Sequence, residues 1–261
     1  MMTRSQITRR RFLTGATVAS TVPLAGCFDF LGVRDNEIRD VLETANSLTY
    51  RVQRFLLGSD TLAREFSESE IRQPMRPNGS TNPRNPAYRA LAEAEFSDYR
   101  LPVDGLVEKP LSLSLDELRN MPARTQITRH DCVEGWSCIA KWTGTPLAAV
   151  LDQAGVKPEA RFVVFECFDS MGSGFLRPIE YYESIDLTDA RHPQTILAYG
   201  MNDKTLPISN GAPLRVRIER QLGYKMAKYI RAIRVTDTLD GYGRGGGGYW
   251  EDNGYEWFAG I

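Results

Sequence analysis

Short segments with strand character begin at Leu101 and recur up to residue 236, and they constrain the fold of the chain most. They alternate in polarity or carry β-branched residues, and strands are expected at residues 101–107, 124–129, 161–168, 196–200, 214–219 and 229–236. Between them, Ser114–Glu117 is a capping box for a short helix, and a helix over 147–154 is ended by Gly155. This mixture predicts an α+β fold, with mixed sheets in one region and helices around them.

The sequence of three other segments does not predict strands. Residues 35–57 place apolar side chains at roughly helical spacing up to Gly58, which predicts a helix. Residues 74–86 contain four prolines and predict an irregular loop, in which Arg76–Gly79 could wrap a ligand or be plain surface. Residues 241–248 are rich in glycine but lack the order of a phosphate-binding loop, so we expect a flexible connector without nucleotide binding.

The composition is that of an ordinary globular protein, with 42% hydrophobic and 25% charged residues. A net charge of −1 argues against a nucleic-acid binder. The length is enough for one large domain with a full core. We therefore expect a signal over residues 1–27, an N-terminal helical segment over 28–70 and a single large domain over 71–261.

The first 27 residues have the features of an export signal. Arg9–Arg11 precede Phe12 and a mildly apolar stretch over residues 16–25 that is too short to span a bilayer. The paired arginines predict the twin-arginine route, which leads to the periplasm or the outer face of the membrane. Leu24–Cys27 resembles a lipobox, and two outcomes stay open: a lipid anchor on Cys27, or ordinary cleavage nearby.

Cys132 lies in a polar segment, RHDCVEGWSCIAKW over residues 129–142, that is crowded with hydrogen-bonding groups. Such a setting suits a reactive or metal-bound thiolate better than the disulfide usual in exported proteins. Composition alone supports two interpretations of Cys132 equally. It is either a nucleophile beside His130 or a ligand to a metal that accepts sulfur. Cys138 and Cys167 are expected to be small buried side chains.

Spaced motifs in the later part of the chain carry a family resemblance. They are RHDCVEGWS at 129–137, WTGTPL at 142–147, PISNGAPLR at 207–215, GYKMAK at 223–228 and the C-terminal run YWEDNGYEWFAGI. Together they resemble the sulfite oxidase family of molybdenum enzymes over roughly residues 70–261. The similarity is greatest to the periplasmic branch that reduces methionine sulfoxide in proteins.

The resemblance implies the molybdopterin-binding fold of that family and a molybdenum centre. One molybdopterin would donate two dithiolene sulfurs to molybdenum, and Cys132 would donate the third. Glu134 and Trp136 would join Cys132 at the catalytic position. The resemblance further implies that the cofactor is bound by Arg76, Asn78, His130, Ser137, Cys167, Asn210, Arg215, Met226, Ala227 and Lys228. Cys167 holds the place of a threonine in that branch.

The implied activity is oxygen-atom transfer to or from a small acceptor. Glu134 would repel sulfite near the metal, so a sulfoxide, free or protein-bound, or an N-oxide is the expected substrate. The chain shows no haem, iron–sulfur or dinucleotide motif, so we expect electrons from a membrane haem protein or a cytochrome. The alternatives are a sulfite-oxidising molybdoenzyme, a metal-free cysteine hydrolase or thiol-redox enzyme, and a non-catalytic lipoprotein that binds a partner.

Overall fold

The computed structural model describes residues 35–58, 60–171 and 179–261, without the side chains of 35–43 and 57. The expected signal and the lipobox at Cys27 lie outside these residues. The helices are α2 (Asp35–Leu57), α3 (Pro86–Glu93), α4 (Leu115–Asn120), α5 (Leu147–Ala154) and α6 (Leu187–Ala190). The strands are β1 (Arg100–Gly105), β2 (Leu111–Ser114), β3 (Arg124–Cys132), β4 (Trp136–Pro146), β5 (Phe162–Met171), β6 (Ile179–Asp186), β7 (Ile196–Met201), β8 (Lys204–Thr205), β9 (Arg215–Arg217) and β10 (Ile230–Thr236). None of the helices described is long and apolar enough to cross a membrane.

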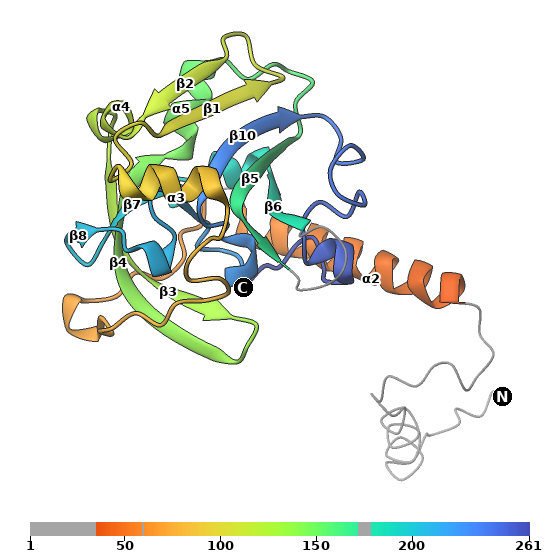
Figure 1. Ribbon diagram of the computed structural model, residues 1–261. Coiled ribbons are helices and arrows are strands. Elements are labelled where there is room, and N and C mark those ends of the chain that lie inside the picture. Colours follow the sequence, from red (N-terminus) through yellow and green to blue (C-terminus); the bar gives the residue numbers. More distant parts are fainter. Residues whose placement is uncertain (1–34, 59, 172–178) are drawn as a thin grey trace, which may run out of the picture. The chain divides into compact units, whose positions relative to one another are not determined.

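The strands form two five-stranded sheets, and the α+β fold class is confirmed (Figure 1). The first sheet has the order β2-β1-β10-β5-β6 and is mixed, because β1 and β10 run parallel while the other pairs are antiparallel. The second sheet has the order β3-β4-β7-β8, with β9 also pairing with β7, and is antiparallel throughout. The sheets expected from sequence are thus one mixed and one antiparallel sheet.

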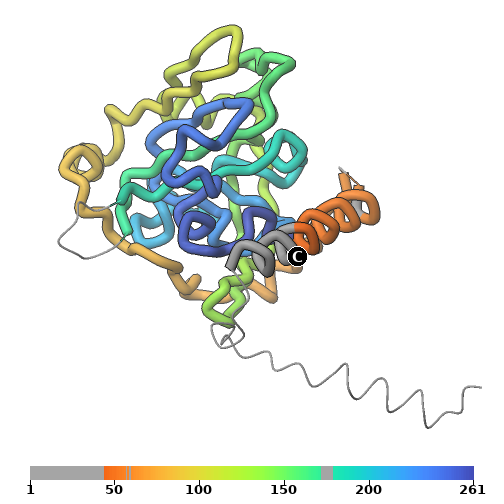
Figure 2. Tube along the Cα trace, turned by 90° about the vertical axis from the view of Figure 1, so that its right-hand side faces the viewer, coloured from red at the N-terminus to blue at the C-terminus, as the bar shows by residue number. Residues whose placement is uncertain are grey.

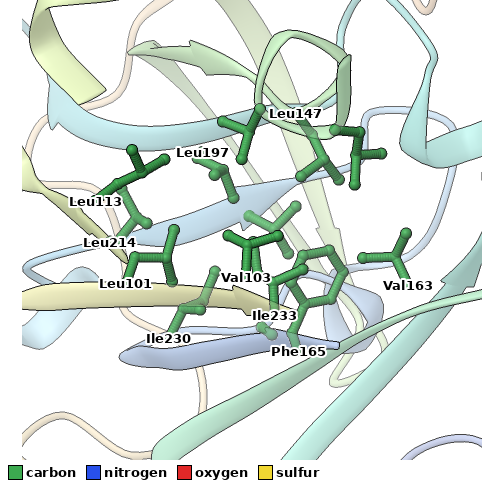
Figure 3. Packing of buried hydrophobic residues seen from close by; sticks show 14 of the residues in the cluster. Leu101, Val103, Leu113, Leu147, Val163, Phe165, Leu197, Leu214, Ile230 and Ile233 are labelled. Atoms are coloured by element: carbon green, nitrogen blue, oxygen red, sulfur yellow. The ribbon is translucent and has the colours of Figure 1, made fainter. Parts of the chain in front are cut away.

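The main hydrophobic core joins the two sheets. Figure 3 shows Val103 of β1, Phe165 of β5 and Ile233 of β10 close to Leu197 of β7 and Leu147 of α5. All five side chains are fully buried. Burial of each such side chain contributes roughly 1.5–3 kcal/mol, so the core holds both sheets in a defined arrangement. The loops at the ends of the strands are therefore carried on a rigid frame.

Local sequence signals correctly predict where several helices begin and end. At the start of α4, the Glu117 N–H donates to Ser114 Oγ at 3.1 Å, and the Glu117 carboxylate accepts from the Ser114 N–H at 2.7 Å. This is the predicted capping box. Helix α5 ends at Gly155, whose φ of 69° lies in the left-handed region that favours glycine. Helix α2 ends before Gly58, as expected.

Two segments differ from the expectation. The polar segment around Cys132 is a β-hairpin of β3 and β4, and β4 buries Cys138, Ala140 and Trp142 in strict alternation. The glycine-rich residues 241–248 are held in place by hydrogen bonds, such as Gly246 N–H to Asp252 Oδ1 at 2.9 Å, so they are not a free connector. At Gly243, Gly247 and Gly248, neighbouring side chains leave no room for a Cβ atom.

The end of the chain packs against the C-terminal half of α2, as Figure 2 shows. The rings of Tyr50 and Phe258 meet edge to face, with centroids 4.8 Å apart. Arg54 donates to the carboxylates of Asp186 and Asp189 at 2.7 and 2.8 Å. These contacts join the last turns of α2 to the C-terminal segment and to the end of β6.

Candidate functional site

A cavity of about 140 Å³ opens where five segments of the chain meet. Its lining residues come from the loop 78–80, the hairpin turn 132–134, the end of β5 at 169–171, the loop 223–228 and the C-terminal segment 250–255, with Tyr181 of β6 between them. Of the residues predicted from sequence, the cavity brings together Asn78, Cys132, Glu134, Met226 and Lys228. The hairpin and the loop 223–228 therefore meet at one site, although they are far apart in the chain.

Cys132 is the last residue of β3 and faces the cavity from the hairpin turn. The turn is closed by the Gly135 N–H, which donates to the Cys132 carbonyl at 3.0 Å. Burial raises the pKa of the Cys132 thiol, and the nearby Glu134 carboxylate adds to the rise, while the Glu134 N–H and Arg76 act in the opposite direction. A thiol activated as a nucleophile needs a lowered pKa, whereas a bound metal deprotonates a coordinating thiol by itself.

His130 is placed as a packed, neutral ring rather than as a base beside Cys132. Its side chain is fully buried, and its Nδ1 accepts from Arg217 at 2.9 Å. Its ring packs so closely against Gly223 that a Cβ atom there would lie 2.5 Å from Nε2. Burial and the adjacent Arg217 lower the pKa of His130 well below its usual range. The metal-ligand interpretation of Cys132 is therefore favoured over the nucleophile interpretation.

Glu134 is held in position at the rim of the cavity. Trp136 Nε1 donates to Glu134 Oε2 at 2.9 Å, and Arg76 lies 4.0 Å from the same oxygen. The Arg76 guanidinium also stacks over the Trp136 ring at 4.8 Å. Trp136 and Arg76 do not line the cavity, and their assignments as a catalytic and a cofactor-binding residue stay predictions.

Behind the cavity lies a group of buried cations with too few carboxylates. Arg217 forms an ion pair with Glu219 at 2.7 Å, but Arg215 donates only to the Asn210 carbonyl, at 2.9 Å. Its Nε and second terminal nitrogen have no partner. Burial, followed by the charge of Arg217, lowers the pKa of Arg215 to about 9. A buried charge without a counter-charge is costly, so this position is suited to a bound anion.

Lys228 extends this positive region into the cavity. Its Nζ donates to the carbonyls of Asn78 and Ser80, which fastens the 78–80 loop to the loop 223–228. Burial and the positive charge of Arg215 lower the pKa of Lys228 to about 7. An anion bound between Arg215 and Lys228 would stabilise the charged form of both side chains.

Several buried polar atoms around the cavity lack hydrogen-bond partners. They include Asn78 Oδ1, Asp169 Oδ1, Asn210 Nδ2 and His130 Nε2. Buried polar groups in native proteins are nearly always hydrogen-bonded. Unpaired donors and acceptors beside an uncompensated positive charge fit a bound group that is polar and carries a phosphate, as molybdopterin does.

The remaining predicted residues lie outside the cavity lining. Asn210 and Ala227 are buried next to Arg215 and Met226 in the second layer of the site. Cys167 is fully buried in the main core, and Ser137 is exposed and donates to Asp131 on the hairpin. Their assignments as cofactor-binding residues stay predictions. Among the residues described, no group of three or more His, Cys, Asp and Glu side chains forms a metal site.

Sequence analysis did not assign an aromatic wall that lines the other side of the cavity. It consists of Tyr181, Tyr224, Trp250 and Tyr255. The Trp250 and Tyr255 rings stack with centroids 5.1 Å apart, and Tyr224 meets Tyr255 edge to face at 5.3 Å. Trp250 and Tyr255 lie in the C-terminal motif YWEDNGYEWFAGI and Tyr224 lies in GYKMAK, so these two motifs were the available signals. Such a wall favours neutral, partly apolar ligands.

Comparison with known proteins identifies a family match over most of the domain. The family model for the oxidoreductase molybdopterin binding domain matches residues 88–241. The chain is 37% identical over 256 residues to the "Putative protein-methionine-sulfoxide reductase subunit YedZ1" of Azospira oryzae, an alignment that covers 97% of this chain and 87% of that protein.

Two partial matches extend this comparison. The chain is 38% identical over 157 residues to the protein-methionine-sulfoxide reductase catalytic subunit MsrP of Xanthomonas campestris pv. campestris, covering 58% of this chain and 49% of that protein. The chain thus matches about half the length of this relative. The solved structure of the sulfane dehydrogenase SoxCD from Paracoccus pantotrophus aligns with a TM-score of 0.48 and 25% identity, over 54% of this chain and 39% of that chain.

Proposed function

This chain belongs to the family of oxidoreductases with a molybdopterin-binding domain, and from this membership we propose that it reduces sulfoxides at the cavity beside Cys132. When bound, molybdopterin supplies a molybdenum centre capable of two-electron oxygen-atom transfer. Cys132 would provide the thiolate ligand, and Arg215 and Lys228 would neutralise the cofactor phosphate. The unpaired amide groups of Asn78 and Asn210 are available to hydrogen-bond the rest of the cofactor.

One observation carries this proposal: two buried cations that form no ion pair with the described residues, Arg215 and Lys228, lie at a cavity that the Cys132 thiol also lines. Arg215 and Lys228 require an anion, while Cys132 presents a soft sulfur ligand at the cavity. A metal-free cysteine enzyme would have no need of the cation pair. A cofactor that combines a phosphate with a sulfur-bound metal needs both features at one site.

The rim of the cavity favours a neutral sulfoxide over sulfite. Glu134 projects into the cavity beside Cys132, and its carboxylate would repel a dianion. The aromatic wall on the other side can pack against the apolar substituents of a sulfoxide. Reduction consumes two electrons and two protons, breaks the sulfur–oxygen bond and yields a thioether and water. The residues of this chain bind and orient the substrate and hold the cofactor during this step. The names of the YedZ1 and MsrP relatives also point to methionine sulfoxide.

We extend the proposal to the cellular setting. The signal over residues 1–27 supports export of the folded protein by the twin-arginine route to the periplasm, and the lipobox supports a lipid on Cys27 at the outer face of the membrane. A membrane haem protein or a diffusing cytochrome would supply the electrons. A lipid anchor would raise the effective concentration of the enzyme near a membrane partner.

Dye-linked assays with matched cysteine variants test the proposed activity. A reduced artificial dye should support turnover of methionine sulfoxide and dimethyl sulfoxide by the wild-type holoenzyme. Cys132→Ser should abolish this turnover while preserving the fold, because oxygen is a poorer ligand for a soft metal. Cys138→Ala, which changes a buried side chain outside the cavity, should retain most of it. Sulfite oxidation without sulfoxide reduction, or equal loss in both variants, would contradict the proposal.

A further inference from the structure

A buried ionic cluster lies directly behind the aromatic wall. Lys225 is fully buried, and its Nζ donates to Glu183 Oε1 and to Glu251 Oε1, each at 2.5 Å. The side chains of all three residues are at most 1% exposed. None of the three lines the cavity, so the cluster does not contact a ligand there.

The composition of the cluster makes it a strong structural constraint. Two carboxylates share one ammonium group, and Glu183 Oε2 and Glu251 Oε2 have no further partner. Burial raises the pKa of Glu183 well above its usual range in spite of Lys225, and Glu251 adds to the rise. Removing Lys225 would leave two buried carboxylates without a counter-charge, and removing either carboxylate would take away one of the two contacts that join these segments through Lys225. The three side chains therefore hold their segments together more firmly than exposed ion pairs would.

Each member of the cluster comes from a segment that also supplies an aromatic side chain to the cavity. Glu183 follows Tyr181 on β6, Lys225 follows Tyr224, and Glu251 follows Trp250. Tyr181 Oη also donates to the Tyr224 carbonyl at 2.7 Å, which joins two of these segments directly.

The glycine-rich run closes over the same cluster. A Cβ atom at Gly248 would lie 2.6 Å from Glu183 Oε1 and equally close to the Glu251 carboxyl carbon, at 2.7 Å. Residue 248 must therefore be glycine for the C-terminal segment to approach β6. The run that resembles a phosphate loop in sequence is instead required by the packing around Lys225.

We propose that Glu183, Lys225 and Glu251 are positioning residues that fix Tyr181, Tyr224 and Trp250 as the wall against which the substrate binds. The proposal rests on the proposed function, because it assigns the substrate to this cavity. It predicts that the cluster controls substrate affinity and the order of the C-terminal segment more than the chemical step.

Variants of Glu251 in the holoenzyme test this role, with Glu256→Ala as a control that removes an exposed carboxylate from the same segment. Glu251→Ala should raise the KM for methionine sulfoxide about tenfold, the scale of one lost aromatic contact, with kcat and molybdenum content largely retained. Hydrogen exchange over residues 249–256 should be faster in this variant. Glu251→Gln keeps an oxygen that can accept from Lys225, and it should recover most of both properties.

Several results would overturn the proposal. These are wild-type exchange rates in Glu251→Ala, an equal rise in KM in Glu256→Ala, or no recovery in Glu251→Gln. If Glu251→Ala does not yield folded protein, the test rests on Glu251→Gln. The proposal then requires that this variant has the KM and the hydrogen-exchange rates of the wild type. Hydrogen exchange does not depend on turnover. A holoenzyme that reduces no sulfoxide would thus contradict the proposed function. The exchange rates would still test whether the cluster orders the C-terminal segment.

Discussion

At the scale of single residues, Arg215 and Lys228 show how buried charge reveals a ligand. Each is buried and has carbonyl partners but no carboxylate of its own. A protein that only needed to pack this region would do so at lower cost with apolar side chains. Under the proposed function, an anion binds between them, and this anion is the phosphate of the cofactor.

Lys228→Met should weaken cofactor retention roughly tenfold or more, because a hydrogen bond to a charged group contributes about 1.5–3 kcal/mol. Molybdenum and pterin content after gel filtration measures this loss. Lys204→Met, which changes an exposed lysine on β8, is the matched control. Full cofactor content in Lys228→Met would show that the phosphate is bound elsewhere.

The same lysine predicts a pH dependence of cofactor binding. The pKa of Lys228 is about 7 before an anion binds, and a bound phosphate would raise it. Cofactor affinity should therefore be greatest below pH 7 and should fall as the pH rises through 7 toward the higher pKa of the bound state. Titrations of the apo-protein with cofactor at pH 6 and pH 8.5 measure this change, and Lys228→Met should flatten it.

Several residues predicted from sequence line the cavity, and other lining residues were not predicted. Cys132, Asn78 and Lys228 stand in recognisable motifs, so their convergence at one cavity could be expected. Asp169 and Tyr181 are single polar residues on strands, with no motif or spacing that marks them. Their role at the cavity depends on strand pairing, which brings together residues far apart in the chain.

At the scale of elements, structure that depends on local signals was predicted well. The helix over 147–154 was predicted to the residue, because its proline start and its glycine end are both local signals. Strand β4 was missed, although its side chains alternate between buried and exposed positions. The many polar residues around Cys132 obscure the alternation with a period of two that is typical of a strand.

The attachment of α2 by Arg54 gives a testable result at this scale. Arg54→Ala should destabilise the protein by about 3 kcal/mol near pH 7, because it leaves Asp186 and Asp189 with one cation fewer. Arg51→Ala, an exposed arginine on the same helix, should change the free energy of unfolding much less. Urea unfolding measures both values.

The destabilisation by Arg54→Ala should depend on pH. Burial alone would raise the pKa of Asp189, but Arg54 and Arg220 outweigh it, so the pKa is lowered in the folded state. The stabilisation is then fully present above the unfolded pKa of about 3.9 and is lost as the pH falls through the lower folded value. The difference between wild type and Arg54→Ala should therefore shrink below pH 4. A difference that is constant down to pH 3 would contradict this account.

At the scale of the whole molecule, the division into two sheets could not be predicted from sequence. Strand β1 pairs in parallel with β10, and Val103 lies opposite Ile233 in that pair. No local pattern indicates a pairing over such a separation, because hydrophobic alternation shows which face is buried but not which strand lies alongside. The fold class could be predicted from the kinds of element in the sequence. The order and pairing of the strands could be learned only from the structure.

The proposed export of the folded protein depends on the arginine pair within residues 1–27. Replacing Arg10 and Arg11 with lysine should leave the protein in the cytoplasm, because the twin-arginine route requires the arginine pair. Arg4→Lys, outside the pair, should be exported normally. Cell fractionation followed by immunoblotting measures the distribution, and normal export of the double variant would contradict the assignment of the route.

The metal and cofactor content of the purified protein tests the central claim most directly. The full chain, matured in a host that makes molybdopterin, should contain about one molybdenum and one pterin per chain, as expected for a single cofactor-binding cavity. Elemental analysis for molybdenum and fluorescence of the oxidised pterin measure both quantities on the same sample. Protein that is folded but contains neither molybdenum nor pterin would contradict the account.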